Sequence, residues 1–440
     1  MTKKPFWKDT LIVGLALFAT FFGAGNLIFP PQIGLFSGDA WGWGVLGLLL
    51  TGIILPVLAI WAIANVGNDA RDLMGHIHPK FYDAFYLITS LLLAIGSTLP
   101  RTAALSHEIG IQPLFPDFPN WATILIFFAL LYFFAYNPTT VIDKVGKYMT
   151  PILLILLAII LIKGVVTPVG TPIDTGIEQP LGDAMLAAYN IGDLTIGILF
   201  GGVILGDLKR RGYNRKECQK GSIVVGLISI VCLFAIYGTL TYIGATGSGS
   251  YAQDTTQTAL LSGLIQDILG RVGLALMGAV VFVAGLTTVI GIATTVITFF
   301  YNFFKQKIPY KVLLLIACVA SVFMALTGVQ NIVNYVTPIF LVVYPMCITM
   351  TFLGLINQFL QNDGFYKGGV LVAGIVSLGD AVLSVVPNLP WLQNLMSLFP
   401  LSGLGFAWVI PTIIGAIVGA ILYRGKPKYA PLPEAEDLAD

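Results

Sequence analysis

The sequence predicts an all-α integral membrane protein with about twelve transmembrane helices, on three observations. Of its 440 residues, 57% are hydrophobic and only 10% are charged, whereas about a quarter of the residues of a soluble globular protein are charged. Its mean hydropathy is +0.88. Many apolar runs reach the roughly 20 residues that a helix needs to cross a bilayer. We therefore expect a single polytopic membrane transport domain over residues 1–428.

The order of the spans predicts an internal repeat. Five spans fall within residues 10–167 and five within 181–357, and an odd number of spans inverts the second set relative to the first. Two additional helices follow over 367–423, and residues 429–440 form a polar tail. The expected spans are 10–36, 42–66, 81–108, 120–137, 143–167, 181–207, 219–245, 272–304, 310–328, 330–357, 367–387 and 403–423.

The positions of Lys and Arg predict the orientation of the chain. If every even-numbered span ends inside the cell, all but three of the 23 basic residues lie on the cytoplasmic side. The exceptions are Arg101, Lys163 and Arg271. Because cytoplasmic loops carry an excess of Lys and Arg, we expect a multi-pass protein of the cell membrane with both termini in the cytoplasm.

The first span is interrupted at its middle by F-G-A-G-N-L-I-F-P-P, residues Phe22–Pro31. A break within hydrocarbon persists only where it lines a cavity or is buried in protein, and secondary transporters hold substrate and ion at such breaks. The alternative is a Gly/Pro kink between packed helices. Freed N–H groups of Gly23, Ala24, Gly25 and Asn26 suit a carboxylate. The Asn26 amide suits a cation or substrate, or else a neighbouring helix.

The sixth span, which leads the second repeat, is interrupted as well. It carries A-Y-N-I-G-D-L-T over Ala188–Thr195 and F-G-G over Phe200–Gly202, and either stretch is a candidate for the break. Tyr189 and Asn190 are expected to shape a pocket there. Paired broken helices at matching positions are the best sequence indication of a transport site.

Two ionisable residues lie within the predicted spans, Asp193 in the sixth and Arg101 in the third. A charge at a helix centre costs about 2.5–3.5 kcal/mol on insertion scales, so each needs a partner or a cavity. One hypothesis is an Arg101–Asp193 ion pair that opens and closes with an outer gate. The alternatives are a static pair, or an Arg101 side chain that reaches the outer surface. Glu108, nearer the outer face, is a further gate candidate.

The eighth span contains A-G-L-T-T, residues Ala284–Thr288. Thr287 and Thr288 place two adjacent hydroxyls in an apolar run, and hard cations prefer oxygen ligands. Threonines are also common at helix interfaces, and Thr294 and Thr295 repeat the pattern in the same span.

Three strings of this chain resemble those of a known family. They are F-G-A-G-N-L-I-F-P-P in the first span, P-R-T-A in the third and Y-N-x-x-D in the sixth. Over nearly its whole length the chain is similar to the bacterial branched-chain amino acid:cation symporters, the leucine/isoleucine/valine carriers. That family is similar in fold to the leucine-transporter-like superfamily of five-plus-five inverted repeats.

The resemblance implies specific site residues. It implies a sodium site from the carbonyls of Ala19 and Phe22 together with Ala284, Thr287 and Thr288. It places the substrate carboxylate near Gly23–Asn26 and the substrate amine near Tyr189–Asp193. No organic cofactor is expected; Na⁺ is the expected coupling ion, with H⁺ as the alternative.

The functional prediction is a secondary active importer of leucine, isoleucine and valine, coupled to Na⁺ by alternating access. The alternative is a proton-coupled symporter of another small neutral amino acid, with Asp193 and Glu108 as proton carriers. An enzyme is not expected, because no nucleophile, base or metal ligands converge in the sequence, and a channel is disfavoured because no repeated filter sequence occurs. The expected partners are the amino acid, the cation and the lipid bilayer, without nucleic acid or an obligate protein partner.

Overall fold

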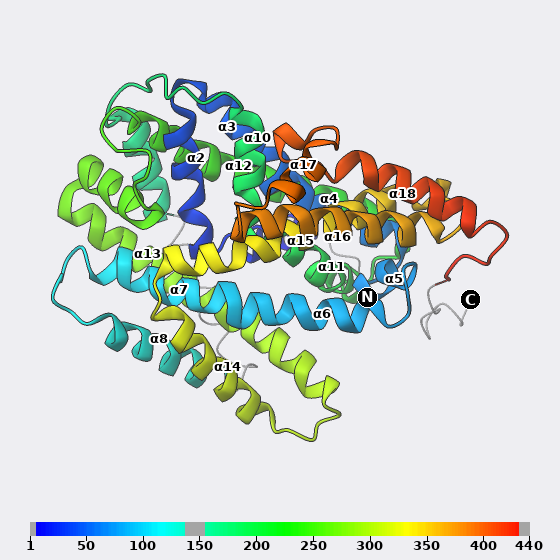
Figure 1. Cartoon of the computed structure of the whole chain (residues 1–440). Helices are drawn as coiled ribbons and strands as arrows, with labels where there is room; N and C mark the ends of the chain where they lie inside the picture. The colour runs from blue at the N-terminus through cyan, green and yellow to red at the C-terminus, as the bar shows by residue number, and fades with distance from the viewer. Residues whose placement is uncertain (1–5, 137–154, 431–440) are drawn as a thin grey trace.

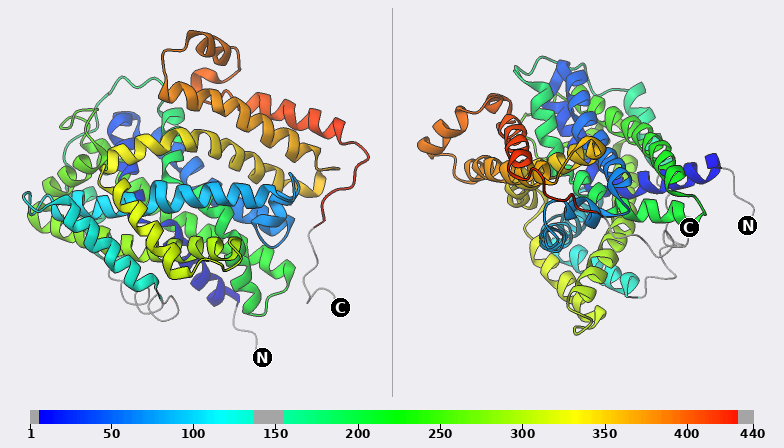
Figure 2. Two further views of the ribbon diagram at one scale, coloured as in Figure 1. Left: turned by 60° about the horizontal axis from the view of Figure 1, so that its bottom comes forward. Right: turned by 90° about the vertical axis from the view of Figure 1, so that its right-hand side faces the viewer.

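The computed structural model describes residues 6–136 and 155–430, most of which belong to helices that pack into one bundle (Figure 1). Figure 2 shows the same bundle from two further sides. The described part of the chain contains no β-strand. The helices of the first half are α1 (Phe6–Phe21), α2 (Phe29–Ser37), α3 (Trp41–Leu48), α4 (Leu55–Val66), α5 (Ala70–Gly75), α6 (Phe81–Leu91), α7 (Leu99–Leu105), α8 (Asn120–Ala135) and a helix over Ile155–Val166. Those of the second half are α10 (Pro180–Ala187), α11 (Asp193–Arg210), α12 (Arg215–Thr246), α13 (Gln257–Phe303), α14 (Tyr310–Ala325), α15 (Val329–Leu355), α16 (Gly364–Val385), α17 (Pro390–Ser397) and α18 (Val409–Leu422).

The lengths and compositions of these helices agree with a membrane protein. Within the described residues, six helices are long and apolar enough to cross a bilayer, or seven if the bent pair α10–α11 is one span. Four shorter apolar helices of 10–17 residues accompany them. Each of the twelve predicted segments contains helix as far as the structure describes it, and residues 143–154 of the fifth segment lie outside the described residues. The count of twelve spans and the inverted repeat stay predictions.

The structure contains the predicted interruption of the first span. Helix α1 ends at Phe21, Gly23 is extended (φ −97°, ψ 154°), and a single 3₁₀ turn covers Ala24–Leu27 before α2 begins at Phe29. Two prolines lie in the first turn of α2, where the missing N–H of proline costs no helical hydrogen bond.

The interruption of the sixth span lies at the first of the two candidate stretches. A 3₁₀ turn over Ala188–Ile191 ends at Gly192, whose left-handed φ of 87° favours glycine. Helix α11 then starts at Asp193, bent by 51° from the preceding helix. Phe200–Gly202 lies inside α11 and is regular helix.

Charged residues gather where the ends of many helices meet. Asp9, near the start of α1, accepts a hydrogen bond from Arg211 at 2.9 Å, and Lys209 at the end of α11 donates to Asn68 after α4 at 2.8 Å. Lys428 donates to the carbonyl of Asn357, after α15, at 2.6 Å. We call this end of the molecule, at the right of Figure 1 beside α5, the basic end.

Candidate functional site

The breaks of the first and sixth spans meet at the side chain of Asn26. Its amide nitrogen lies 3.0 and 3.1 Å from the two carboxylate oxygens of Asp193, 2.7 Å from the carbonyl oxygen of Phe21 and 3.1 Å from the hydroxyl of Tyr237. An amide nitrogen carries only two hydrogens, yet four oxygen atoms surround this one. Asp193 is 1% exposed. The position of the nitrogen is therefore a buried, oxygen-rich place that suits a positively charged group.

Arg101, in α7, lies on the other side of these breaks. Its Nη1 donates to the backbone carbonyl of Asn190 at 2.8 Å, and its guanidinium lies over the ring of Phe29 at 5.2 Å. The Nε atom is buried and makes no hydrogen bond. Nε and Nη2 face Gly25, where an added Cβ would lie 2.8 and 2.9 Å from them. Because of these short distances, only glycine at position 25 allows the guanidinium to lie so close to the backbone. The edge formed by Nε and Nη2 has the geometry that binds a carboxylate with two parallel hydrogen bonds.

Six of the predicted site residues share one small cavity. Its volume is about 10 Å³, roughly the space that one water needs. Among its lining residues are Gly23, Gly25, Asn26, Arg101, Asp193 and Thr288. Arg101 and Asp193, both described, form no ion pair within 4 Å; Arg101 is bonded to the Asn190 carbonyl and Asp193 to the Asn26 amide. The hypothesis of a gate that closes through this pair stays a prediction.

At the break in the first span, two backbone carbonyls do not accept the usual helical hydrogen bond from the N–H four residues later. The N–H of Gly23 donates to Phe21 at 3.0 Å and not to Ala19, four residues before it. The N–H of Asn26 donates to Gly23 at 3.0 Å and not to Phe22. The carbonyls of Ala19 and Phe22 thus lose their helical donors, and these are the two carbonyls that the resemblance implies as sodium ligands.

Helix α13 brings the predicted threonines beside this break. Thr288 and Gly23 line the same small cavity, and a Cβ added to Gly23 would lie 3.5 Å from the methyl group of Thr288. The Thr287 hydroxyl donates to the carbonyl of Ala284 in its own helix at 2.9 Å. A role of these residues as cation ligands stays a prediction.

Other predicted residues lie away from the cavity. The Tyr189 ring stacks on Tyr344 at 4.6 Å and lines a separate groove. Glu108 accepts a hydrogen bond from the N–H of Val329 at 2.9 Å and so stabilises the start of α15. Ala24 is buried, and its Cβ would lie 3.4 Å from a Cβ added to Gly285 of α13.

Some polar residues of the site were missed by sequence reasoning. Tyr237 contacts Asn26, Tyr344 accepts from the N–H of Leu194 at 3.3 Å, and Thr337 donates to the side chain of Asn190 at 2.7 Å. The signal for the tyrosines is their position inside apolar spans, because a buried hydroxyl needs a partner.

The sequence comparisons identify the family. Residues 7–426 match the family model described as branched-chain amino acid transport protein. The chain belongs to this family. It is 33% identical to the branched-chain amino acid permease BraB of Bacillus subtilis (strain 168), over 94% of this chain and 95% of that protein. It is 32% identical to the branched-chain amino acid permease BrnQ of the same organism, over 96% of this chain and 98% of that protein.

Solved structures show the same fold at low sequence identity. An inward-facing conformation of Mhp1 has a TM-score of 0.61 at 14% identity and covers 94% of this chain and 90% of its own. A manganese transporter mutant from Eremococcus coleocola also has a TM-score of 0.61, at 13% identity, over 96% and 97% of the two chains. These likenesses show that the chain has the predicted leucine-transporter-like fold. Its family identifies it as a transporter rather than an enzyme.

Proposed function

We propose that this chain imports leucine, isoleucine and valine across the cell membrane, coupled to Na⁺ by alternating access, with both termini in the cytoplasm. The observation that carries the proposal is the meeting of two broken spans at Asn26 and Asp193, with Arg101 beside them. The permeases of Bacillus subtilis to which the chain is similar are named for branched-chain amino acids, which supports this substrate class.

The two buried charges of the site match the two ends of an amino acid zwitterion. The Asp193 carboxylate would bind the substrate ammonium. The ammonium would then take the place of the Asn26 amide nitrogen among the four surrounding oxygen atoms. The free edge of Arg101, with the N–H groups of Ala24 and Gly25, would bind the substrate carboxylate, because the N–H groups of Gly23 and Asn26 are already bonded to backbone carbonyls. Charge-assisted hydrogen bonds of this kind are roughly twice as strong as neutral ones.

The cation would bind next to the substrate. Its proposed ligands are the carbonyls of Ala19, Phe22 and Ala284 with the hydroxyls of Thr287 and Thr288. The support is that the carbonyls of Ala19 and Phe22 have lost their helical donors and that Thr288 lines the same cavity as Gly23 of this break. An inward-moving positive charge gains about 2.3 kcal/mol per 100 mV, which favours import.

The apolar side chain of the substrate needs space that opens only when the spans move. A second cavity of about 40 Å³ adjoins the first at Thr20 and Phe21 and is lined by apolar residues such as Ile60 and Phe200. Both cavities are too small for an amino acid, so alternating access must separate their walls. One methylene contributes about 0.8 kcal/mol, so leucine, isoleucine and valine should compete within about tenfold.

Uptake of labelled leucine into proteoliposomes tests the proposal, with an inward Na⁺ gradient against an equal K⁺ gradient at fixed pH and voltage. Uptake that requires Na⁺ is the expected result. Uptake indifferent to Na⁺ and driven by a pH step would replace it with the proton-coupled alternative. The buried Asp193 carboxylate in the cavity favours that alternative as the second candidate, whereas Glu108 lies at the start of α15.

A further inference from the structure

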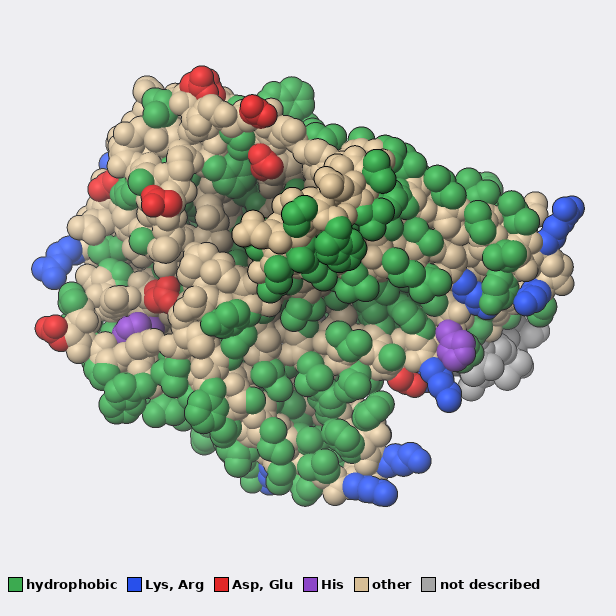
Figure 3. Space-filling view, viewed as in Figure 1, with side chains coloured by type: hydrophobic (Ala, Val, Ile, Leu, Met, Phe, Trp, Pro, Cys, Tyr) green, Lys and Arg blue, Asp and Glu red, His purple; other side chains and the backbone are tan. Residues whose placement is uncertain are grey.

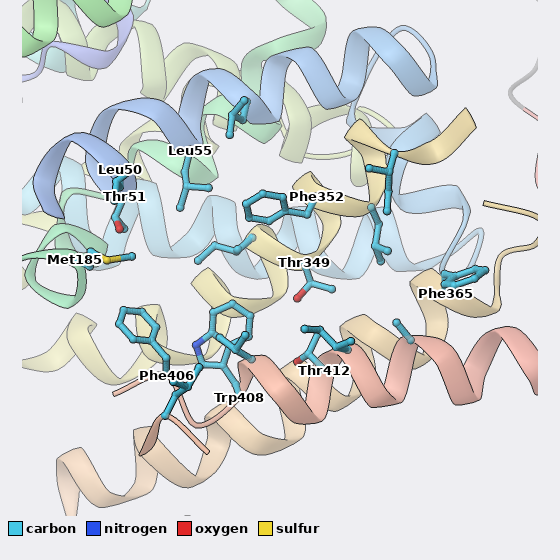
Figure 4. A pocket seen from close by; sticks show the side chains of 18 of the residues that line it. Leu50, Thr51, Leu55, Met185, Thr349, Phe352, Phe365, Phe406, Trp408 and Thr412 are labelled. Carbon is cyan, nitrogen blue, oxygen red and sulfur yellow. The ribbon is translucent and has the colours of Figure 1, made fainter. Parts of the chain in front are cut away.

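A groove of about 700 Å³ lies on the face of the bundle between the second span and α18, with α15 behind it (Figure 4). Its lining is apolar almost throughout and includes Leu55, Phe352 and Ile413. Phe352 and Ile413 are half exposed, and hydrophobic side chains cover much of the face seen in Figure 3. The lining helices lie within the predicted spans, so we expect the groove to face the hydrocarbon of the bilayer, where water does not fill it.

Positive charges lie at one end of this groove, the basic end. Leu360 lines the groove there, and its carbonyl accepts a hydrogen bond from Lys428 Nζ at 3.1 Å. Lys367 and Lys426 both place Nζ over the ring of Tyr423, at 4.2 and 4.4 Å from the ring centre. An α-helix rises 1.5 Å per residue, so Tyr423 lies only about 9 Å along α18 from Ile417, which lines the groove.

Asp363, which lies near Lys428, is bonded to groups other than Lys367 and Lys426. The Asp363 carboxylate is bonded to His76 at 2.6 Å and to the N–H of Tyr429 at 2.7 Å. Within the described residues, Lys367 and Lys426 have no acidic partner within 4 Å. The groove therefore combines an apolar channel with an adjacent cationic pair, which is complementary to an amphiphile with a negative head.

We propose that this groove binds an acyl chain of an anionic phospholipid whose phosphate lies on Lys367 and Lys426. Lipid tails are as apolar as leucine, so the chain is held by close contact with the groove walls and gains no hydrophobic preference over bulk lipid. Preference for one phospholipid over another then comes from the charge of its head group.

An acyl chain in the groove would lie beside the broken segment of the sixth span, which forms part of the transport site. The groove extends to Tyr189, the residue before Asn190, whose carbonyl holds Arg101 at 2.8 Å. The bound acyl chain therefore supports the broken segment of the sixth span from the membrane side.

Native mass spectrometry of the purified full chain, titrated with phosphatidylglycerol or phosphatidylcholine, tests the proposal. We expect the wild-type chain to retain phosphatidylglycerol in preference. Lys367→Gln/Lys426→Gln should weaken this retention by about tenfold or more, as the loss of two contacts to an anionic lipid predicts. The matched control is Lys305→Gln/Lys307→Gln, which removes the same charge after α13 and should leave retention unchanged.

A second pair of variants tests the apolar part independently of charge. Ile413→Trp fills the groove and should displace both lipids, whereas Ile414→Trp, on the same helix and 56% exposed but outside the groove, should not. Equal retention of phosphatidylglycerol in the two lysine variants would overturn the proposal. A dimer that Ile413→Trp abolishes would overturn it as well, because a second copy of the chain would then cover the groove.

Discussion

The amide of Asn26 lies 3.0 and 3.1 Å from the two carboxylate oxygens of Asp193, and this contact joins residues 167 positions apart in the chain. Because Asn26 also holds the carbonyl of Phe21 at 2.7 Å, one side chain satisfies groups from both broken spans. The two breaks thus form a single hydrogen-bonded unit. A movement of α11 that carries Asp193 must also act on the break between α1 and α2.

Asp193→Asn should reduce leucine uptake by about tenfold to a hundredfold. The change keeps the shape of the side chain but removes the charge offered to the substrate ammonium, and hydrogen bonds to charged groups contribute about 1.5–3 kcal/mol. The measurement is the initial rate of labelled leucine uptake in proteoliposomes at equal protein content. Asp117→Asn, at an exposed position, should transport like the wild type, and a wild-type rate for Asp193→Asn would remove Asp193 from this role.

The break in the first span could be predicted because glycines, Asn26 and two prolines interrupt an otherwise apolar run. The break in the sixth span could not be placed, because Gly192, Gly201 and Gly202 look alike in sequence. Their environments differ: Gly192 is left-handed, whereas a Cβ on Gly201 would lie 2.7 Å from Ile63 and one on Gly202 2.8 Å from Asp69. The latter two permit close packing of α11, which only the tertiary structure shows.

The charges of Arg101, Asp193 and Glu108 predicted that these side chains need polar partners, but not which groups those partners are. Arg101 and Asp193 do share a cavity, yet the first is bonded to the Asn190 carbonyl and the second to Asn26. Glu108 is bonded to a backbone N–H at the start of α15, a place where helix geometry stabilises a carboxylate. Backbone groups are acceptors and donors at every position, so sequence does not reveal such pairings.

Thr287→Val/Thr288→Val should raise the sodium concentration for half-maximal uptake by about tenfold or more, because two proposed oxygen ligands are lost while the shape is nearly kept. The matched control is Thr294→Val/Thr295→Val, seven residues further along α13, where both hydroxyls are bonded to the carbonyl of Gly291. Sodium titrations of leucine uptake compare the two. The same shift in both variants would contradict the proposed ion site.

Gly25→Ala should reduce the maximal rate of uptake by about tenfold or more, because the new methyl group would displace the Arg101 guanidinium from its place beside the break. Displacing a buried charge from its partners is costly. Gly206→Ala is the matched control: beyond its own stretch of helix backbone, no atom lies within 4 Å of its added Cβ, and alanine favours the helix by up to about 1 kcal/mol. Equal rates for the two variants would show that the close approach at Gly25 is not needed for transport.

The stability of the folded protein should fall as the pH drops below about 6.5, owing to His76 at the basic end. Its Nδ1 lies 2.6 Å from Asp363, its ring stacks on Tyr366 at 4.7 Å, and its buried Nε2 has no partner. Burial lowers the pKa of His76 below its usual value, against the opposing effect of Asp363. The unfolded chain therefore binds this proton first, at about pH 6.5, and the stability present above that pH is lost as the pH falls through the lower pKa of the folded state. Thermal unfolding in detergent between pH 7.5 and 5.5 should show a smaller decline for His76→Gln than for the wild type, and a wild-type decline for His78→Gln at its exposed position. An unchanged decline in His76→Gln would assign the pH dependence to another group.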